Sequence, residues 1–248
     1  MRRFGLIGYP LSHSFSKIYF TEKFEKLGLS DAQYELFPLK SIDELPQLLS
    51  KHPDLRGLNV TIPYKEQVIP FLHELDETAA AVGAVNTILI GEKLRGFNTD
   101  VYGFRQSIKP FLTSKHERAL ILGTGGASKA VHHVLKTIGI DCGFVTRDKT
   151  KVPPGALAFH YEELNEHVMR AFKLIVNTTP LGMQPDANSF PPLPYAHLDA
   201  EHLLYDLVYN PAETEFMKRG KQNGAQVMNG LDMLRLQAEK AWEIWTRL

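Results

Sequence analysis

Short apolar segments recur along the chain, and longer stretches in which apolar residues follow helical spacing separate them. Six of the short segments read as buried strands, at residues 4–8, 57–62, 119–122, 143–146, 174–177 and 203–208. Strands that alternate with helices in this way are typical of a parallel sheet with helices on both faces. The pattern therefore predicts an α/β fold.

The first half of the chain ends in a predicted hairpin, in which residues 87–90 and 93–97 flank the turn Gly91-Glu92. From about Val101 a helix leads into a strand, a glycine-rich turn and another helix, which is how a nucleotide-binding fold begins. The last helix, predicted over residues 231–248, carries an apolar stripe that needs a partner surface. Its spacing alone does not identify that surface.

The composition favours a small-molecule ligand. Lysine plus arginine and aspartate plus glutamate both number 28, so no basic surplus points to nucleic acid or a membrane surface. The sequence has no apolar run long enough to span a bilayer and no recognisable signal peptide, so we expect a cytoplasmic protein. Cys142 is the single cysteine and the ten histidines lack paired spacing, so we expect neither an internal disulfide nor a metal site.

A glycine-rich turn follows the predicted strand that starts near Glu117. In such a turn Gly123 permits the sharp bend, and Gly125 lets the backbone approach a pyrophosphate at the N-terminus of the next helix, predicted over residues 129–138. Glycine also serves tight turns in proteins that bind nothing. The position between strand and helix favours dinucleotide binding through Gly123, Thr124, Gly125, Gly126 and Ala127.

The residue after Thr146 favours NADP over NAD. NAD enzymes commonly place an acid at the end of this strand for the ribose 2′-hydroxyl, whereas this chain has Arg147 there. A guanidinium can clamp a 2′-phosphate, and Lys151 adds positive charge nearby. Asp148 leaves NAD open, because it could pair with Arg147 or hold a ribose hydroxyl. A solvated charge run in a turn is the other alternative.

Three polar segments mark the first half: residues 12–16, 59–65 and 86–87. Loops at the carboxyl ends of strands are where open α/β sheets bind ligands, although serine, threonine and asparagine also cap helices and turns. Along residues 59–62, Val60 and Ile62 can pack inward, while Asn59 and Thr61 line the other face.

Lys65 and Asp100 are the charged residues near these segments that a fold could bring together. Transfer of hydride to a ketone leaves an alkoxide, and a lysine of lowered pKa could protonate it while an aspartate orients the lysine. Alternatively, Lys65 is a surface residue at a helix start and Asp100 caps the next helix.

Together these segments resemble the shikimate dehydrogenase family, over essentially the whole chain. Eight ordered segments carry the resemblance: residues 12–16 (SHSFS), 59–66 (NVTIPYKE), 83–87 (GAVNT), 96–100 (GFNTD), 123–127 (GTGGA), 177–183 (NTTPLGM), 205–211 (YDLVYNP) and 229–234 (NGLDML).

The resemblance implies NADP-linked reduction of 3-dehydroshikimate to shikimate, a step toward aromatic amino acids. It implies Lys65 and Asp100 as the catalytic pair. The substrate-binding residues that it implies are Ser14, Ser16, Asn59, Thr61, Asn86, Tyr209 and Gln237. The cofactor-binding residues that it implies are Gly123, Thr124, Gly125, Gly126, Ala127, Thr146, Arg147, Lys151, Glu77, Leu207 and Gly230.

The resemblance also implies two domains. Residues 1–100, completed by the helix 231–248, would form a discontinuous α/β substrate domain with a mostly parallel sheet. Residues 101–230 would form a Rossmann-type, doubly wound domain for NADP, and the cleft between the domains would hold both ligands. We expect a monomer or a homodimer.

Three departures from the family pattern bear on the prediction: Lys17 replaces a usual proline, Thr146-Arg147-Asp148 replaces Asn-Arg-Thr, and Asp232 stands where a small residue is common. None removes a proton-transfer group. An NAD-preferring quinate/shikimate dehydrogenase is the nearest alternative, and a non-catalytic shikimate-binding regulator is an alternative from another class.

Overall fold

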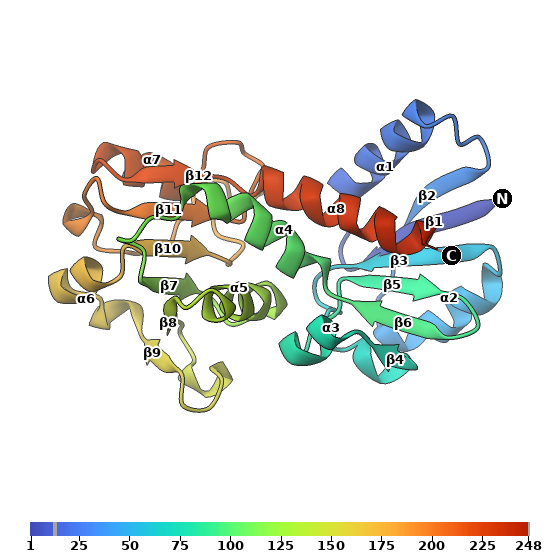
Figure 1. Cartoon of the computed structure of the whole chain (residues 1–248), viewed down its shortest axis with the longest axis horizontal. Helices are drawn as coiled ribbons and strands as arrows, with labels where there is room; N and C mark the ends of the chain where they lie inside the picture. Colours follow the sequence, from blue (N-terminus) through green and yellow to red (C-terminus); the bar gives the residue numbers. More distant parts are fainter. Residues whose placement is uncertain (12–13, 248) are drawn as a thin grey trace. The chain divides into compact units, whose positions relative to one another are not determined.

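The computed structural model describes residues 1–11 and 14–247. The chain divides into two compact units: unit 1 comprises Met1–Thr99 with Ala238–Leu248, and unit 2 comprises Asp100–Gln237 (Figure 1). Each unit contains one six-stranded sheet. The predicted α/β fold is therefore confirmed.

The sheet of unit 1 is mixed, in the order β2-β1-β3-β5-β6-β4. Its strands are β1 (Arg2–Gly8), β2 (Ala32–Pro38), β3 (Leu55–Val60), β4 (Glu74–Leu75), β5 (Thr87–Ile90) and β6 (Leu94–Phe97). β1 pairs in parallel with β2 and β3, and β4 with β6, whereas β5 runs antiparallel to β3 and β6. The carboxyl end of β3 consequently lies beside the start of β5.

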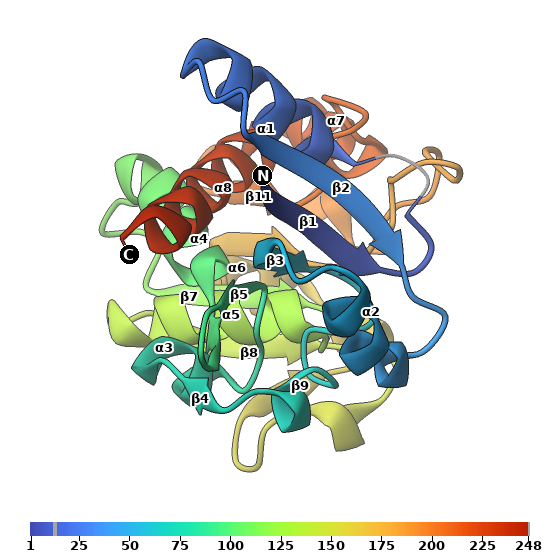
Figure 2. The ribbon, with the colours of Figure 1, turned by 90° about the vertical axis from the view of Figure 1, so that its right-hand side faces the viewer.

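Helices cover both faces of this sheet (Figure 2). They are α1 (Phe15–Lys26), α2 (Leu45–Lys51) and α3 (Glu77–Val82), with the short 3₁₀ helices η1 (Ile42–Glu44) and η2 (Ile69–Phe71). Phe20 and Phe24 of α1 pack on Phe4 of β1, while Leu45 and Leu48 belong to a second core on the opposite face.

The sheet of unit 2 is entirely parallel, in the order β12-β11-β10-β7-β8-β9. Its strands are β7 (Arg118–Leu122), β8 (Asp141–Val145), β9 (Leu157–Phe159), β10 (Leu174–Asn177), β11 (Leu203–Asp206) and β12 (Gln226–Met228). This is the doubly wound dinucleotide-binding order, which reverses between β7 and β10. Ligands of such sheets bind outside the carboxyl ends of the strands at that reversal.

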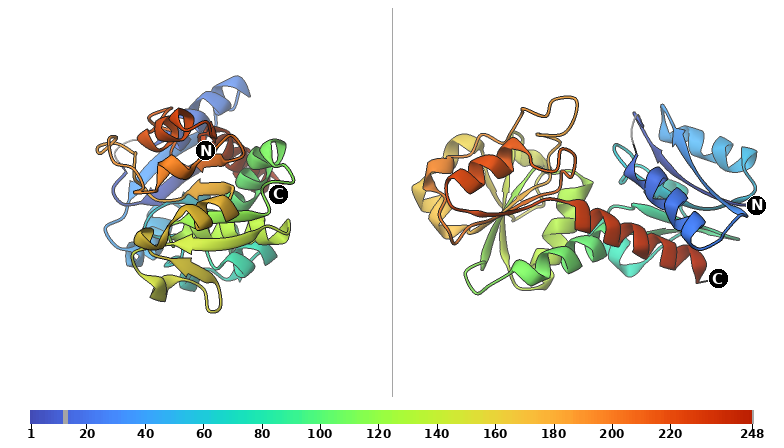
Figure 3. Two further views of the ribbon diagram at one scale, coloured as in Figure 1. Left: turned by 90° about the vertical axis from the view of Figure 1, so that its left-hand side faces the viewer. Right: turned by 90° about the horizontal axis from the view of Figure 1, so that it is seen from above.

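Helices pack on both faces of the second sheet (Figure 3). They are α4 (Thr99–Ile108), α5 (Gly126–Thr137), α6 (Glu166–Ala171), α7 (Glu215–Gln222), the start of α8 (Leu231–Thr246), and η3 (Lys109–Phe111), η4 (Lys149–Lys151), η5 (Tyr161–Glu163) and η6 (Tyr195–His197). α4, α5 and α8 contribute to one core, and α6 and α7 to the other.

The last helix finds the partner surfaces that its apolar stripe requires. Met233 belongs to a core of unit 2, whereas Ala238, Ala241 and Trp245 belong to a core of unit 1. The indole nitrogen of Trp245 donates a hydrogen bond to the carbonyl oxygen of Ile88, at 2.9 Å. The division between units thus falls inside this helix, at residues 237–238, whereas the sequence places the whole of 231–248 with the first domain.

The structure also corrects two sequence expectations. The helix after the glycine-rich turn begins at Gly126, three residues before the predicted start. Ile62 does not pack inward, because β3 ends at Val60 and the chain turns away, leaving Ile62 65% exposed. Within the described ranges, no helix is long and apolar enough to cross a membrane.

Candidate active site

Polar residues of unit 1 gather where β3 ends and β5 begins. Asn59 is the fifth residue of β3, Asn86 immediately precedes β5, and Thr99 begins α4 just after β6. All three side chains are buried, at 1–4% exposure. Buried amides and hydroxyls must find hydrogen-bond partners within the protein, so they form a network rather than separate contacts.

Asn86 is fixed on both sides of its amide. Its nitrogen donates to the Thr99 hydroxyl at 2.9 Å, and its oxygen accepts from the Thr99 backbone N–H at 2.7 Å and from the Thr87 hydroxyl at 3.2 Å. The Thr87 hydroxyl in turn accepts from the side-chain nitrogen of Asn59, at 3.2 Å. The network therefore fixes the position of Thr99, which directly precedes Asp100.

Tyr34 of β2 extends this network toward α1, and sequence reasoning did not find it. Its hydroxyl donates to the side-chain oxygen of Asn59 at 2.7 Å. Burial raises the pKa of Tyr34 far above its ordinary value, and the nearby Ser16 hydroxyl acts in the opposite direction. A neutral tyrosine thus donates to Asn59 from the side of the sheet that α1 covers.

The remaining substrate-binding candidates of unit 1 are Ser14 and Thr61. Ser14 caps α1, since its hydroxyl accepts from the Lys17 N–H at 3.3 Å. Thr61 follows β3 and is half-buried, and its backbone N–H donates to the Ile7 carbonyl oxygen at 2.9 Å. Ser12 and His13, which the polar motif includes, lie outside the described residues.

Lys65 does not begin a helix. It lies in a run of turns over residues 62–68, where its carbonyl oxygen accepts from the Val85 N–H at 2.7 Å. The preceding Tyr64 anchors this run, because its buried hydroxyl donates to the Leu39 carbonyl at 2.6 Å. The backbone of Lys65 is thereby fixed beside the segment that leads to Asn86, and its side chain is half-buried.

Asp100 is the second residue of α4 and is 6% exposed. A carboxylate is favoured in the first turn of a helix, where the backbone N–H groups point outward. Lys65 belongs to unit 1 and Asp100 to unit 2, so their action as a pair stays a prediction. The other substrate-binding candidates of unit 2 are Tyr209, half-buried, and Gln237, buried near the middle of α8.

The glycine-rich turn of unit 2 has the geometry of a phosphate cradle. Gly123 has a φ of +105°, a conformation that favours glycine, and a Cβ there would meet the Thr178 hydroxyl at 3.0 Å. A Cβ on Gly125 would meet nothing within 4 Å, so this stretch of backbone faces open space. Gly125 also precedes α5 without a side-chain cap, which leaves the N–H groups of the first turn available for an anion. Thr124 precedes Gly125, and Ala127 follows Gly126 in the first turn of α5.

Asp148 does not neutralise Arg147. The Asp148 carboxylate accepts from the N–H and hydroxyl of Thr150, at 3.0 and 2.6 Å, and lies 3.6 Å from Lys151. These hydrogen bonds hold the pKa of Asp148 below its ordinary value. Arg147 is exposed, and in the described part of the chain it has no ion-pair partner. Its guanidinium is therefore available to an anion.

Leu207 and Gly230 meet at the carboxyl end of β11. A Cβ on Gly230 would collide with the carbonyl group of Leu207, so only glycine permits this approach. The adjoining Asp206 is fully buried and accepts from Asn177 at 2.9 Å and from Thr214 at 2.6 Å. Burial raises the pKa of Asp206 to about 6, while these hydrogen bonds act in the opposite direction.

Glu77, the remaining cofactor-binding candidate, is placed in unit 1. It is exposed and begins α3, where Asp76 caps the helix. Thr146 follows β8 in unit 2 and accepts from the Asp148 N–H at 3.1 Å, so it shapes the turn that carries Arg147.

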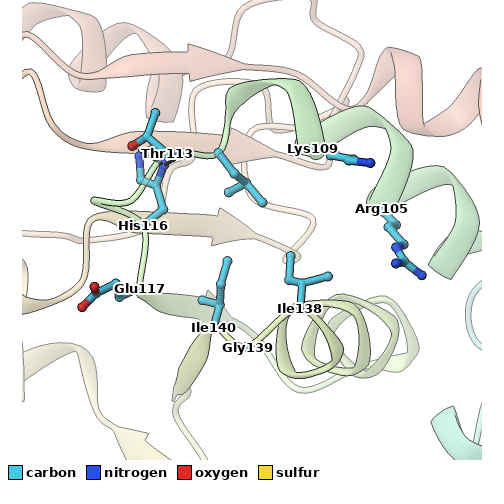
Figure 4. Close-up of a pocket in the computed structure, with 9 residues that line it drawn as sticks. Arg105, Lys109, Thr113, His116, Glu117, Ile138, Gly139 and Ile140 are labelled. Atoms are coloured by element: carbon cyan, nitrogen blue, oxygen red, sulfur yellow. Dashed lines mark hydrogen bonds between the residues drawn. The ribbon is translucent and has the colours of Figure 1, made fainter.

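A cavity of about 360 Å³ lies at the end of the second sheet where the strands begin, between α4 and the start of β8 (Figure 4). Arg105 and Lys109 line it on the α4 side, and Ile138 and Ile140 line it on the side of the α5–β8 turn. The cavity is at the amino ends of the strands, so it is separate from the glycine-rich turn. Among residues 1–11 and 14–247, no group of three or more histidine, cysteine or acidic side chains is placed to hold a metal ion.

Comparisons with known proteins agree with this geometry. A family model described as the shikimate dehydrogenase substrate binding domain matches residues 6–88. Shikimate dehydrogenase (NADP(+)) of Carboxydothermus hydrogenoformans is 40% identical, over 98% of this chain and 90% of that protein.

Two solved structures are similar over the whole chain. The shikimate 5-dehydrogenase of Thermus thermophilus, in complex with NADP(H) and shikimate, has a TM-score of 0.87 and 34% identity, with 94% of that chain covered. Quinate dehydrogenase of Corynebacterium glutamicum, in complex with NAD, has a TM-score of 0.87 and 29% identity, also with 94% covered.

Proposed function

The chain belongs to the shikimate dehydrogenase family, and we propose that it catalyses the reversible NADPH-dependent reduction of 3-dehydroshikimate to shikimate, in aromatic amino acid biosynthesis. The observation that carries the proposal is the combination of a buried hydroxyl and amide network in unit 1 with a phosphate cradle and the exposed Arg147 in unit 2. We assign substrate binding to the first domain and NADP binding to the second. The expected cytoplasmic location stays a prediction.

The substrate groups match the side chains of the network. Ser14 and Ser16 hydroxyls would donate to the carboxylate of shikimate, and Thr61, Asn86, Tyr209 and Gln237 would contact the ring hydroxyls. Asn59 stays a substrate-binding candidate beside them, and its amide, like that of Asn86, is oriented by hydrogen bonds within the network. Neutral donors and acceptors suit a polyhydroxylated ring because each hydroxyl both donates and accepts.

Lys65 and Asp100 supply the proton chemistry. NADPH, when bound, supplies the hydride from C4 of its nicotinamide. As the carbonyl carbon of 3-dehydroshikimate accepts that hydride, the carbonyl oxygen takes a proton from the Lys65 ammonium and becomes a hydroxyl. In the reverse direction Lys65 accepts the hydroxyl proton. Asp100 would accept a hydrogen bond from the same hydroxyl and so orient it for proton transfer.

The cofactor candidates fit NADP. Gly123–Ala127 would receive the pyrophosphate on backbone N–H groups at the start of α5, and Arg147 with Lys151 would bind the 2′-phosphate. Thr146 shapes that turn, Leu207 and Gly230 would contact the nicotinamide end, and Glu77 completes the set. The exposed guanidinium of Arg147 favours NADP over NAD.

An assay that crosses NADP and NAD with shikimate and quinate tests the proposal. We expect kcat/KM to be highest for NADP with shikimate, by at least tenfold over each other pair. Equal rates with NAD would contradict the assignment of Arg147, and higher rates with quinate would favour the quinate/shikimate alternative. Shikimate binding in calorimetry without any turnover would favour a non-catalytic regulator.

A further inference from the structure

At Gly103, α4 and the first part of α8 approach each other too closely to leave room for a side chain (Figures 1 and 3). A Cβ on Gly103 would lie 2.5 Å from the Met233 carbonyl oxygen and 3.1 Å from the backbone nitrogen of Gln237. Both distances are shorter than ordinary van der Waals contact, and both atoms belong to the backbone, which cannot turn aside as a flexible side chain can. Any residue larger than glycine therefore forces the two helices apart.

The backbone conformation of α4 does not explain this glycine. Gly103 lies in the interior of the helix and does not have a positive φ. At such a position glycine is less favourable than alanine by about 1 kcal/mol, so the close approach to α8 is the feature that requires it. Phe104 and Ile108 bury α4 in the core of unit 2. Ser107 also hydrogen-bonds the hydroxyl of Tyr205 on β11, at 2.7 Å, so α4 is anchored on the sheet.

Two candidate site residues of unit 2 lie at this helix contact. Asp100 precedes Gly103 by three residues, and residues at that spacing are neighbours on the surface of a helix. Gln237 is one of the two residues that a Cβ on Gly103 would meet. Both side chains are buried, at 6% and 7% exposure. The contact at Gly103 therefore holds together two helices whose candidate residues are far apart in the sequence.

We propose that Gly103 is a positioning residue, which holds α4 and α8 at the separation that lets the Asp100 carboxylate and the Gln237 amide act on the same substrate. The inference rests on the proposed function, because it takes both side chains to contact shikimate. It goes further in placing substrate affinity and turnover under the control of a residue that has no side chain. A displacement of about 1 Å can slow an enzyme by about 100-fold, so one methyl group is enough to test it.

Gly103→Ala is the direct test, because it adds that methyl group and removes no functional atom. The Met233 oxygen would have to move from 2.5 Å to at least 3.4 Å from the new Cβ to restore ordinary contact. We expect kcat/KM for shikimate to fall by about 10- to 100-fold and calorimetric Kd for shikimate to rise about tenfold. Kd for NADPH should stay nearly unchanged, since its phosphates are proposed to bind at the start of α5 and at Arg147.

Gly220→Ala is the matched control. Gly220 is also buried inside a helix of unit 2, α7, and a Cβ there would lie 2.6 Å from the side chain of Leu204. Leu204 and the buried residues of α7 belong to the other core of this unit, which α4 and α8 do not share. Both glycine variants should lose thermal stability, yet only Gly103→Ala should lose shikimate turnover and affinity.

Two variants of Gln237 test the route by which Gly103 acts. Gln237→Ala removes the amide and keeps the Cβ, so its effect on Kd for shikimate and that of Gly103→Ala should be less than additive in the double variant. Gln237→Asn withdraws the amide by one methylene group without crowding the helices, and it should reproduce the loss of shikimate affinity. This variant also provides the test if Gly103→Ala does not fold.

The outcomes separate the inference from the function on which it rests. If wild-type protein binds shikimate and Gly103→Ala changes neither its Kd nor kcat/KM, the inference is overturned alone. Equal kinetic losses in Gly103→Ala and Gly220→Ala would overturn it too, because general destabilisation would then be the cause. Fully additive effects in the double variant, or unchanged affinity in Gln237→Asn, would overturn the action through Gln237. If wild-type protein fails to bind shikimate, the proposed function and the inference fall together.

Discussion

The two units prepare a ligand site by different means, although each does so at the carboxyl ends of sheet strands. Unit 1 uses side chains: a buried chain of hydroxyls and amides runs from Tyr34 through Asn59 and Thr87 to Thr99. Unit 2 uses mainly backbone: a glycine with positive φ and the uncapped start of α5. A substitution damages the site of unit 1 by removing a functional group. It damages the site of unit 2 by preventing the backbone conformation that the turn requires.

Lys65→Ala should cause the largest effect, because it removes the proton donor from the side-chain site. We expect kcat to fall by about 10²–10⁴-fold, the usual contribution of general acid–base catalysis. Shikimate affinity should stay within about tenfold, or about 1.4 kcal/mol, since other residues hold the ring. Steady-state kinetics and calorimetry give the two values, with Lys40→Ala, an exposed lysine of the same unit, as the control.

A large loss of affinity with substantial remaining turnover would instead make Lys65 a binding group. The proton donor would then have to be sought elsewhere in the chain.

Gly123→Ala should break the backbone site without removing any functional atom. Its φ of +105° disfavours any residue with a Cβ, and the new methyl group would crowd Thr178 and Thr179. We expect KM for NADP to rise at least tenfold while calorimetric shikimate affinity is unchanged. Gly139→Ala is the control. Gly139 also has a positive φ, of +82°, but it lies just before β8, at the amino ends of the strands and away from the glycine-rich turn. Equal effects from both variants would mean that general strain, not the cradle, is responsible.

Arg147→Ala sharpens the comparison, since Arg147 is a side chain in the mainly backbone site. Loss of its charge-assisted hydrogen bonds should raise KM for NADP about tenfold or more and leave KM for NAD nearly unchanged. The ratio of kcat/KM for the two cofactors measures this. Arg170→Ala, an exposed arginine on α6, should not change the ratio, and an equal loss for NADP and NAD in Arg147→Ala would contradict a contact with the 2′-phosphate.

Much of unit 2 could be predicted from the sequence, because its central strands are buried on both faces and read as continuous apolar runs. β10, for example, matches the predicted 174–177 residue for residue. β4, β9 and β12 were missed: each lies at a sheet edge and has only two or three residues, too few for a periodic pattern. β2, the other edge strand, alternates irregularly between buried and exposed positions.

The candidate site was predictable in its motifs but not in its contacts. The glycine-rich turn was recognisable because its function depends on backbone conformation, which glycine reports directly. Tyr34 was not, because it lies on a missed strand and its hydrogen bond to Asn59 exists only in the tertiary fold. For the same reason the inward packing expected for Ile62 was wrong: the turn after β3 is not visible in the alternation.

Asp206→Asn should change the kinetic constants least, because it acts on the stability of the fold and not on either ligand. Burial raises the pKa of Asp206 from 3.8 to about 6, so between these values the folded state holds a proton that the unfolded state has lost. Stability contributed by this group is therefore present below about pH 4 and is lost as pH rises through about 6, by roughly 3 kcal/mol at most.

The asparagine variant should lack this pH dependence. The Tm of both proteins is measured at pH 5 and at pH 7. We expect the Tm of wild type minus the Tm of the variant to be several degrees smaller at pH 7 than at pH 5. Parallel curves for the two proteins would mean that Asp206 titrates alike in the folded and unfolded states.

The most direct test of the account follows the hydrogen that is transferred. Shikimate carrying deuterium on the carbinol carbon that becomes the ketone is incubated with NADP and the protein, and the reduced cofactor is analysed by mass spectrometry. The account predicts one deuterium at C4 of the nicotinamide, with a slower rate than for unlabelled shikimate if hydride transfer limits turnover. Reduced cofactor without deuterium, or no reduced cofactor at all, would contradict it.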